Sequence, residues 1–359
     1  MSNFDLANLA LQATCPNNEL LYDDKGMPSV MVKIPKMTYA QLGLGTSTTV
    51  HPAFIVNGVE KDAIWISKYQ NVVVDGRAYS LPARDPKTVI NFDAAVSACS
   101  AKGNGWHLMT KAEWGLLALW CKVNGTMPYG NNNYGKDSRE TTYKAIPTYY
   151  DAGKIGRVAT GTGPLSWSHD RTPSGIWDLN GNVWEWNGGI RLVAGEVQII
   201  ANNNAADKSI SQGASSSAWK AINAATGALI TPDGSGTTAG SVKLDYISSK
   251  FTYSTSITDK KDEGRGCAFE NVTCDATIGD AAKLLLQSLG MLKYDTVAGA
   301  YDSDYFWMNN GATERSLFSG GYWSYGANAG VFYSNGNSAR SYAYGHVGFR
   351  SAFCDLSSD

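Results

Sequence analysis

The sequence is poor in charged residues, and its basic residues are not concentrated anywhere along the chain. Only 17% of its 359 residues are Asp, Glu, Lys or Arg, and the formal net charge is -2. Binding to phosphates depends on a concentrated basic patch, so this composition excludes nucleic acid as an expected partner.

Cysteine and histidine are also scarce, which argues against redox and metal chemistry. The six cysteines form no pair of CxxC motifs; they are Cys15, Cys99, Cys121, Cys267, Cys274 and Cys354. Cys267 and Cys274 could be bridged around one turn, although free buried thiols are expected in a reducing compartment. The four histidines lack metal-ligand spacing; they are His51, His107, His169 and His346. We therefore expect no bound metal and no cofactor.

The N-terminus MSNFDLANLALQATCPNN has no basic start and no long apolar run, so we expect no secretory signal and no direct membrane insertion. Residues 1–26 are polar with turn signals, and we predict an N-terminal arm or attachment segment. With 43% hydrophobic residues, the chain can form one large domain, expected over 27–356. Residues 188–313 are rich in Ala, Ser, Thr, Gly and Asn and are predicted to be a partly ordered insertion in it.

Short apolar runs between turn residues predict strands at MVKIP, HPAFIV and AIWISKY, the first beginning at Met31. Periodic apolar residues predict helices over about 91–102, 110–122 and 280–292. In the second helix Thr110 precedes Glu113 by three residues, the spacing of a capping box. The apolar face of this helix consists of Trp114, Leu117, Ala118 and Cys121.

The segment 319–350 sets tyrosines among Ser, Gly, Asn and Ala, with Arg340 and Arg350 as its only charged residues. This composition is typical of antigen-combining loops, because Tyr offers a large contact area while Ser, Gly and Asn supply adaptable hydrogen bonds. A nucleophile, base or metal-ligand set at fixed spacing is not present. Edge strands and turns of a β-rich domain share the same composition, so composition alone leaves both readings open.

Six separated motifs then occur in a fixed order: MVKIP, HLMTKAEWGLLAL, MPYGN, GIWDLNGNVWEW, GGYW and VGFR. In this order they resemble the formylglycine-generating-enzyme-like proteins, the sulfatase-modifying-factor branch of the C-type-lectin fold. The resemblance covers about 27–190 and 317–356. It implies an α+β, C-type-lectin-like fold of the formylglycine-generating-enzyme type, with short strands, two core helices, long loops and a large insertion.

Within GIWDLNGNVWEW, three tryptophans bring large apolar areas to a loop-rich fold: Trp177, Trp184 and Trp186. Glu185 lies between two of them, so we expect it to be partly buried and paired, with Arg350 as the candidate partner. A carboxylate and a guanidinium in aromatic surroundings more often fix the fold than catalyse, so we predict a structural pair.

The sequence departs from the enzymes of that family where their chemistry resides. Those enzymes carry a redox-active cysteine pair between their GGSW and GFR motifs, whereas 321–349 contains no cysteine and Cys354 stands alone beyond it. The related iron-dependent sulfoxide synthases use a histidine cluster, which is missing here. We therefore predict no catalytic residues and no enzyme; an oxidase or other modifying enzyme with relocated ligands is the alternative.

The same interval resembles the variable proteins of diversity-generating retroelements, which include phage tropism determinants. It reads GGYWSYG from Gly320, AGVF from Ala329, ARS from Ala339 and GFR from Gly348. In that family adenine-directed mutagenesis rewrites asparagine-type codons, and the residues between the fixed letters here belong to the types that such codons yield. The resemblance implies that 319–350 is a C-terminal variable region.

The resemblance divides this region into contact residues and scaffold. The implied ligand-binding positions are Tyr322, Ser324, Tyr325, Asn335, Ser338, Tyr342, Tyr344 and His346, with Tyr333, Asn337 and Gly345 as weaker candidates. The scaffold that the resemblance implies in this region is Trp323, Phe332, Ala339, Arg340, Phe349 and Arg350. Outside the region, we also predict scaffold roles for Trp177, Trp184, Glu185 and Trp186. Arg340 could instead be a cationic contact.

The expected function is therefore ligand display: a hypervariable surface that binds a macromolecular receptor, such as a host cell-surface protein or glycan. The resemblance implies a phage tail tip, hence the virion, with the bacterial cytoplasm or cell surface as alternative locations. A structural virion component, with contacts to neighbouring subunits or to further copies, is also open. Calcium-dependent sugar binding is less expected, because no EPN- or QPD-like motif occurs.

Overall fold

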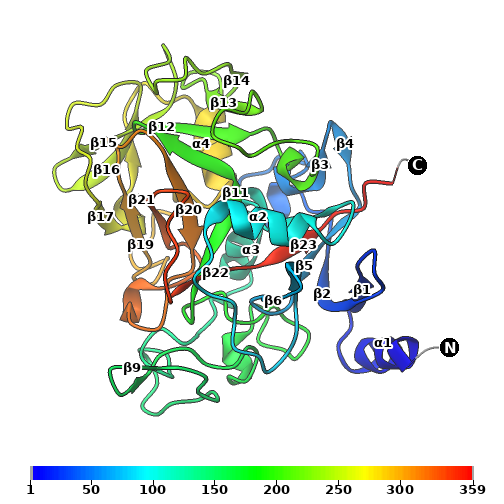
Figure 1. The fold of residues 1–359 in the computed structure, drawn as a ribbon. Coiled ribbons are helices and arrows are strands. Elements are labelled where there is room, and N and C mark those ends of the chain that lie inside the picture. Colours follow the sequence, from blue (N-terminus) through cyan, green and yellow to red (C-terminus); the bar gives the residue numbers. More distant parts are fainter. Residues whose placement is uncertain (1–2, 358–359) are drawn as a thin grey trace.

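A computed structural model describes residues 3–357, in which helices and strands mix in the predicted α+β class (Figure 1). The α-helices are α1 (Asn3–Thr14), α2 (Phe92–Ser100), α3 (Lys111–Val123) and α4 (Asp280–Ser288). Short 3-10 helices are η1 (Ala40–Leu42), η2 (Pro52–Phe54), η3 (Leu165–Trp167), η4 (Asn204–Ala206), η5 (Phe269–Asn271) and η6 (Gly326–Asn328).

The strands before the central β11 are short. They are β1 (Asn18–Tyr22), β2 (Pro28–Pro35), β3 (Ile55–Val56), β4 (Val59–Glu60), β5 (Ala63–Ser67), β6 (Val72–Val74), β7 (Arg77–Tyr79), β8 (Trp106–Leu108), β9 (Tyr150–Asp151) and β10 (Lys154–Ile155). From β11 onward they are β11 (Trp184–Val193), β12 (Glu196–Ile200), β13 (Trp219–Ile222), β14 (Leu229–Ile230), β15 (Lys243–Ile247), β16 (Lys250–Ser254), β17 (Arg265–Ala268), β18 (Thr273–Cys274), β19 (Tyr305–Met308), β20 (Arg315–Ser319), β21 (Ser334–Ser338), β22 (Val347–Phe349) and β23 (Ser351–Phe353).

Two sheets have more than two strands among the described residues, and the smaller of these two joins the two ends of the chain. Its order is β1-β2-β5-β23-β8, so the last strand, β23, is inserted between β5 and β8. Ala352 lies opposite Ile66 on one side and His107 on the other. The end of the predicted variable region is therefore held by strands from the first third of the chain.

The larger sheet is centred on β11, which follows directly from the NGNVWEW motif. β11 pairs antiparallel with β12 and β20 and parallel with β22, while β21 lies between β20 and β19. Both regular strands of the predicted variable region, β21 and β22, are thus hydrogen-bonded members of this sheet. The loops between them carry the remaining residues of the region.

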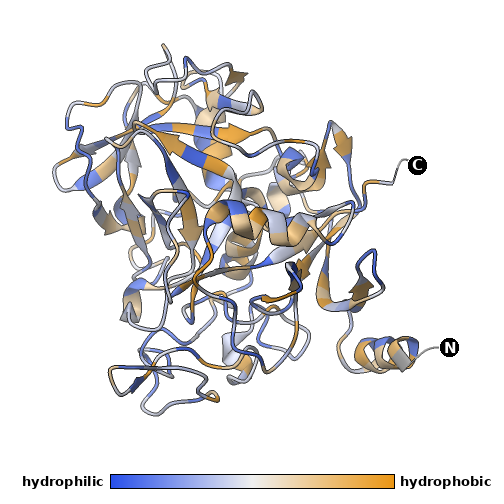
Figure 2. Ribbon diagram, viewed as in Figure 1, coloured by the Kyte–Doolittle hydropathy of each residue, from blue (hydrophilic) through white to orange (hydrophobic). Residues whose placement is uncertain are grey.

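Helix α3 packs against both sheets, since its buried residues share one cluster with residues of β2 and β11. Its N-terminal cap and its apolar face are as predicted. Thr110 is its N-cap, and its hydroxyl and the Glu113 carboxylate complete the capping box. All four residues of its predicted apolar face are buried: Trp114, Leu117, Ala118 and Cys121. Figure 2 shows hydrophobic residues gathered on the strands and on this helix inside the body. The helices predicted over 91–102 and 280–292 are confirmed as α2 and α4, the latter ending earlier than predicted.

The predicted insertion, 188–313, is more regular than expected. It begins inside β11 and contributes β12 to β19, of which β19 pairs directly with β21. Its aromatic residues Phe251, Phe269 and Phe306 belong to the same buried cluster as the α3 residues. The insertion therefore extends the central sheet and supports the C-terminal region.

The structure adds detail to the predicted arm and corrects one predicted strand. The predicted arm, whose residues 1–2 lie outside the described part, contains α1 and then β1, which is the edge strand of the smaller sheet. Figure 1 shows α1 standing beside the body, near β1. The run HPAFIV forms η2 followed by the two-residue β3 rather than one strand, because His51 caps the 3-10 turn by accepting from the Ala53 N–H.

Candidate binding surface

The predicted variable region is anchored where it starts. β20 ends at Ser319, and Gly320 and Gly321 then turn the chain with φ of +95° and +85°. A Cβ on Gly321 would lie 2.5 Å from the Ala329 Cβ. Both the left-handed backbone and the close approach require glycine at this turn. The GG and AG motifs are therefore packed against one another, which fixes where the intervening loop starts and ends.

The scaffold residues of this region are buried. Phe332 packs between Phe269 and Tyr301, with ring centroids 5.0 and 4.9 Å away. Its backbone N–H donates to the buried Asp304 carboxylate at 2.7 Å, and burial raises the pKa of Asp304 well above its usual range. Trp323 is also buried, and its indole N–H donates to Asp151 at 3.2 Å. The predicted scaffold role of Phe332 and Trp323 agrees with these contacts.

The predicted pair of Glu185 and Arg350 is confirmed. The guanidinium donates to both carboxylate oxygens, at 2.9 and 2.8 Å, and both side chains are fully buried. Arg350 also donates to the backbone carbonyls of Ser67 and Trp177, each at 2.8 Å. Gln70 donates to the same carboxylate at 3.0 Å. This network ties β11, β5 and the GFR motif into one rigid unit.

Arg340 is held by the frame on every side. It donates to both oxygens of Glu314 (2.9 and 3.2 Å), to Asp93 at 2.6 Å and to the Gln212 carbonyl at 3.0 Å. Its guanidinium lies 5.3 Å from the centre of the Phe92 ring. With its donors engaged in this way, Arg340 acts as a support for the loop that follows it.

Five ring side chains form a connected surface that we call the aromatic face: Tyr322, Tyr325, Tyr342, Tyr344 and His346. Tyr322 stacks on His346 at 4.4 Å and meets Tyr325 edge-on at 4.7 Å. Tyr342 stacks on Tyr344 at 4.8 Å, and its hydroxyl hydrogen-bonds His346 Nε2 at 3.2 Å. The two loops that flank β21 thereby meet through their side chains, which places all five rings on one surface.

The aromatic face rests on a buried aromatic layer. Tyr325 contacts Trp184 at 5.3 Å between centroids, and Tyr342 contacts Phe318 at 6.3 Å. Tyr322, Tyr325 and Tyr342 are consequently half-buried, whereas Tyr344 is 57% exposed. Ser324, Asn337, Ser338 and Gly345 are half-buried around them. These residues keep an accessible side.

Two of the predicted contact residues need correction. Tyr333 is 1% exposed and packs on Trp184 at 4.6 Å, and Asn335 is 6% exposed on β21. Tyr333 directly precedes β21 and also packs against Tyr305 and Tyr325, at 6.0 and 5.4 Å, whereas Asn335 lies on β21 and its Oδ1 accepts the Asn337 N–H. Their side chains belong to the frame, out of reach of a macromolecular partner.

The aromatic face carries no net charge near neutral pH. Burial lowers the pKa of His346, so its imidazole is neutral there. Burial raises the pKa of Tyr325 to about 12 and also raises that of Tyr342, so both hydroxyls stay protonated. The face thus offers ring surfaces, hydroxyl groups and one imidazole, a set suited to contact and hydrogen bonding.

The cysteines are set up for packing rather than for reactivity. All six thiols are free, including Cys267 and Cys274, and only Cys274 is not fully buried. Burial raises the pKa of Cys274 to about 11 and that of Cys354 to about 12. Since the thiolate is the reactive form, these thiols are poor nucleophiles at neutral pH. Within residues 3–357, no group of three or more His, Cys, Asp or Glu side chains is placed to hold a metal ion.

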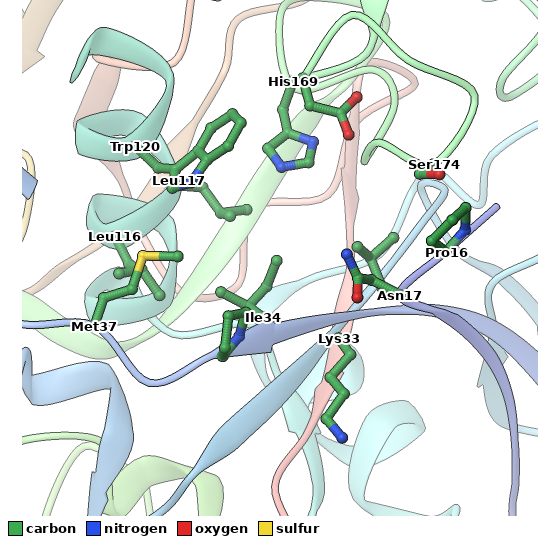
Figure 3. Close-up of a pocket in the computed structure, with 13 residues that line it drawn as sticks. Pro16, Asn17, Lys33, Ile34, Met37, Leu116, Leu117, Trp120, His169 and Ser174 are labelled. Atoms are coloured by element: carbon green, nitrogen blue, oxygen red, sulfur yellow. The ribbon is translucent and has the colours of Figure 1, made fainter. Parts of the chain in front are cut away.

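A cavity of about 200 Å³ lies elsewhere, between β2, α3 and the loop that carries His169 (Figure 3). Its walls are mainly apolar, with Ile34, Leu117 and Trp120 among them. His169 packs on Trp120 at 4.8 Å, its Nδ1 accepts the Ile176 N–H, and burial lowers its pKa to about 4. The imidazole is therefore neutral and committed to a backbone hydrogen bond, as a structural histidine would be.

Three residues that support the region were not found from the sequence. Asp304 fixes the AGVF motif, Lys111 donates to the hydroxyls of Ser319 and Ser334 beneath β20 and β21, and Arg157 donates to the Gly345 carbonyl at 3.0 Å. Lys111 and Arg157 lie far from the C-terminal segment in the sequence, and Asp304 lies in the insertion that precedes it. A lysine within the first turn of an apolar helix was the only local signal for Lys111.

The fold and site define an α+β protein that presents an uncharged aromatic surface on a buried, ion-paired frame. Residues 46–191 match the family model described as the sulfatase-modifying factor enzyme 1-like domain. That match confirms, over these residues, the resemblance to formylglycine-generating-enzyme-like proteins. Among characterised protein sequences, the comparison finds no match.

Several solved structures match this chain at low sequence identity. The Major Tropism Determinant U1 variant matches with 12% identity and a TM-score of 0.29, over 90% of this chain and 62% of that one. The variable protein 1 of Treponema denticola matches with 12% identity and a TM-score of 0.33, over 94% and 99%. PvdO from Pseudomonas aeruginosa matches with 12% identity and a TM-score of 0.30, over 93% and 97%. TM-scores at this level carry no functional argument.

Proposed function

We propose that this protein displays a diversified surface that binds a macromolecular target, as a phage receptor-binding protein at the tail tip would. The observation that carries the proposal is the aromatic face: five rings from two loops, uncharged, mounted on residues that are themselves buried. Tyrosine-rich surfaces bind because each ring gives large contact area for little lost side-chain freedom. The proposed contact residues are the aromatic face together with Ser324, Asn337, Ser338 and Gly345.

The division between face and frame supports diversification. Tyr344 lies mostly in solvent, whereas the adjacent frame residues Trp323, Phe349 and Arg350 are buried. Substitutions at exposed positions usually change stability by less than about 0.5 kcal/mol, while truncation of a buried aromatic residue costs about 3–5 kcal/mol. A surface built in this way can change its recognition chemistry without unfolding.

The absence of enzymatic activity is part of the proposal. Buried thiols with raised pKa values and histidines committed to structural hydrogen bonds support it. In the described part of the chain, none of the helices is long and apolar enough to cross a membrane.

A library experiment tests the proposal without a known target. Every position from 319 to 350 is randomised singly, and folded variants are recovered by protease resistance. We expect Tyr344, Tyr342 and His346 to accept most side chains, and Trp323, Tyr333 and Arg350 to accept few. If both groups of positions accepted substitutions equally well, the division into variable contact residues and fixed frame residues would be refuted. Sequencing of the surrounding DNA tests diversification itself: we expect a near-copy of the last coding stretch that differs at adenines, beside a reverse transcriptase gene.

A further inference from the structure

A second set of exposed side chains adjoins the aromatic face but lies outside 319–350. It comes from two segments: the hairpin that contains β9 and β10, drawn in the lower part of Figure 1, and the loop 83–89. Tyr150 and Val89 are each more than half exposed, and Tyr149 is 40% exposed. We call Tyr149, Tyr150 and Val89 the flanking patch.

Arg157 joins these segments to the variable region. Its guanidinium donates to both oxygens of Asp85, each at 2.9 Å, and to the Gly345 carbonyl at 3.0 Å. It also lies 4.4 Å from the centre of the Tyr149 ring. One side chain therefore holds the loop 83–89, the hairpin and the C-terminal loop in a fixed relation.

A second contact route runs through Trp323. Its ring lies 5.8 Å from Tyr149 and 5.0 Å from Tyr322, and its indole N–H donates to Asp151 on β9. The aromatic face and the hairpin thus share a buried neighbour. The hairpin can contribute contact area next to the variable tyrosines without any change in their positions.

Val89 is held in a costly conformation. Its φ is +53°, which a β-branched side chain rarely adopts, and its N–H donates to the Tyr344 carbonyl at 3.0 Å. Asn tolerates this conformation far better than Val. An exposed apolar residue kept in strained backbone beside a binding surface indicates that its side chain serves recognition rather than stability.

Basic side chains outnumber acidic ones among the unpaired charged residues around this surface. Asp85 is paired with Arg157, whereas Asp151 accepts a hydrogen bond from the uncharged Trp323 indole and forms no ion pair among residues 3–357. Arg84, Lys87 and Lys154 are exposed and form no ion pair within the described residues. Three cations against the one carboxylate of Asp151 leave an excess of positive charge at this margin, although the whole chain has a net charge of -2. Opposite charges at a rim favour association and partner choice.

We propose that the flanking patch is an invariant half of the binding surface, and that the target is a folded protein with an apolar contact region and acidic residues at its margin. This inference rests on the proposed display function. The variable tyrosines would select among such proteins, while Val89, Tyr149 and Tyr150 contact each of them.

The test uses the full chain with Tyr322, Tyr342, Tyr344 and His346 randomised, selected on three immobilised probes. Two are α-lactalbumin and lysozyme, which share a fold and carry opposite net charge; the third is mannan, a polysaccharide. We expect most binders on α-lactalbumin, with association that weakens as salt is raised. Equal recovery on lysozyme would overturn the acidic margin, and recovery on mannan alone would overturn a protein target.

The flanking patch is tested in the selected binders. Val89→Asn and Tyr150→Ser should each weaken binding by about tenfold, the loss typical of a well-placed contact. The matched controls Val297→Ser and Tyr22→Ser, at exposed positions outside both segments, should change it less than about twofold. Val89→Asn should also raise the thermal stability, because it relieves the strain. Binding unchanged by Val89→Asn and Tyr150→Ser would overturn the invariant half, whereas failure to select any binder from a folded library would count against the display function itself.

Discussion

Replacement of Arg350 by leucine should remove a large part of the stability of this fold. The guanidinium makes four hydrogen bonds inside the protein: two to Glu185 and one each to the carbonyls of Ser67 and Trp177. Arg350→Leu leaves a fully buried carboxylate whose charge is no longer balanced. Breaking a buried pair from one side costs about 3–5 kcal/mol, and each carbonyl left without its donor adds about 1 kcal/mol or more.

A loss of about 5 kcal/mol is a large share of the roughly 5–15 kcal/mol that stabilises an ordinary domain. Equilibrium unfolding in urea, followed by the fluorescence of the 11 tryptophans, measures it. The double variant Glu185→Leu/Arg350→Leu should be more stable than Arg350→Leu, because no charge is then left unpaired.

The control for this experiment is an exposed pair. Lys36 lies 3.0 Å from Asp62, whose side chain is almost fully in solvent, so Lys36→Met should leave the free energy of unfolding nearly unchanged. A loss below about 1 kcal/mol for Arg350→Leu would refute the reasoning. So would a double variant that is destabilised by the sum of its two single changes, since the pair would then act as two independent residues.

Three further predictions concern protonation and burial, and urea unfolding measures each. Burial lowers the pKa of Lys111 from 10.5 to about 7, so between these pH values the folded state binds fewer protons than the unfolded state. The free energy of unfolding should therefore rise by about 1 kcal/mol per pH unit in this range, and Lys111→Met should remove this dependence on pH. Burial raises the pKa of Asp304 in the folded state, so its contribution to the free energy of unfolding is complete below pH 3.8 and is lost as pH rises through the folded pKa. Asp304→Asn retains an acceptor for the Phe332 N–H and should therefore stabilise the protein at neutral pH; a loss of stability there would contradict this. Tyr333→Ser should cost about 3 kcal/mol and Tyr344→Ser less than about 0.5 kcal/mol; similar costs would contradict their assigned places.

Local patterns in the sequence predicted the parts of the fold that depend on local interactions. The capping box of α3 is one, because Thr110 and Glu113 are neighbours on the first turn. The Glu185 and Arg350 pair is a different case. It was predictable because a carboxylate between two tryptophans must be buried and must find a cation, and few cations were available near the C-terminus.

The burial of Tyr333, directly before β21, and of Asn335, on β21, was not predictable. Tyr333 and Asn335 belong to the same tyrosine- and asparagine-rich composition as Tyr344, and nothing local distinguishes them. Tyr333 is buried because Trp184 and Tyr305, which lie in other parts of the chain, pack against its ring, and Asn335 lies on β21, which pairs with the insertion strand β19. The flanking patch was missed for a similar reason, since Arg157 joins it to Gly345 across a large sequence separation.

The aromatic face is only partly free to vary, and the contacts within it set the limits. Tyr344 contributes little to the buried layer, so its replacement changes what a partner meets and little else. The Tyr325 ring packs against Trp184 and Tyr333, so each substitution of Tyr325 alters both target binding and packing. A diversified set of such proteins should therefore vary most at Tyr344 and retain ring side chains at Tyr325. The range of targets is then limited, because part of each ring already packs against buried residues and cannot change without loss of stability. An invariant flanking patch would supply additional contact area that does not depend on the variable positions.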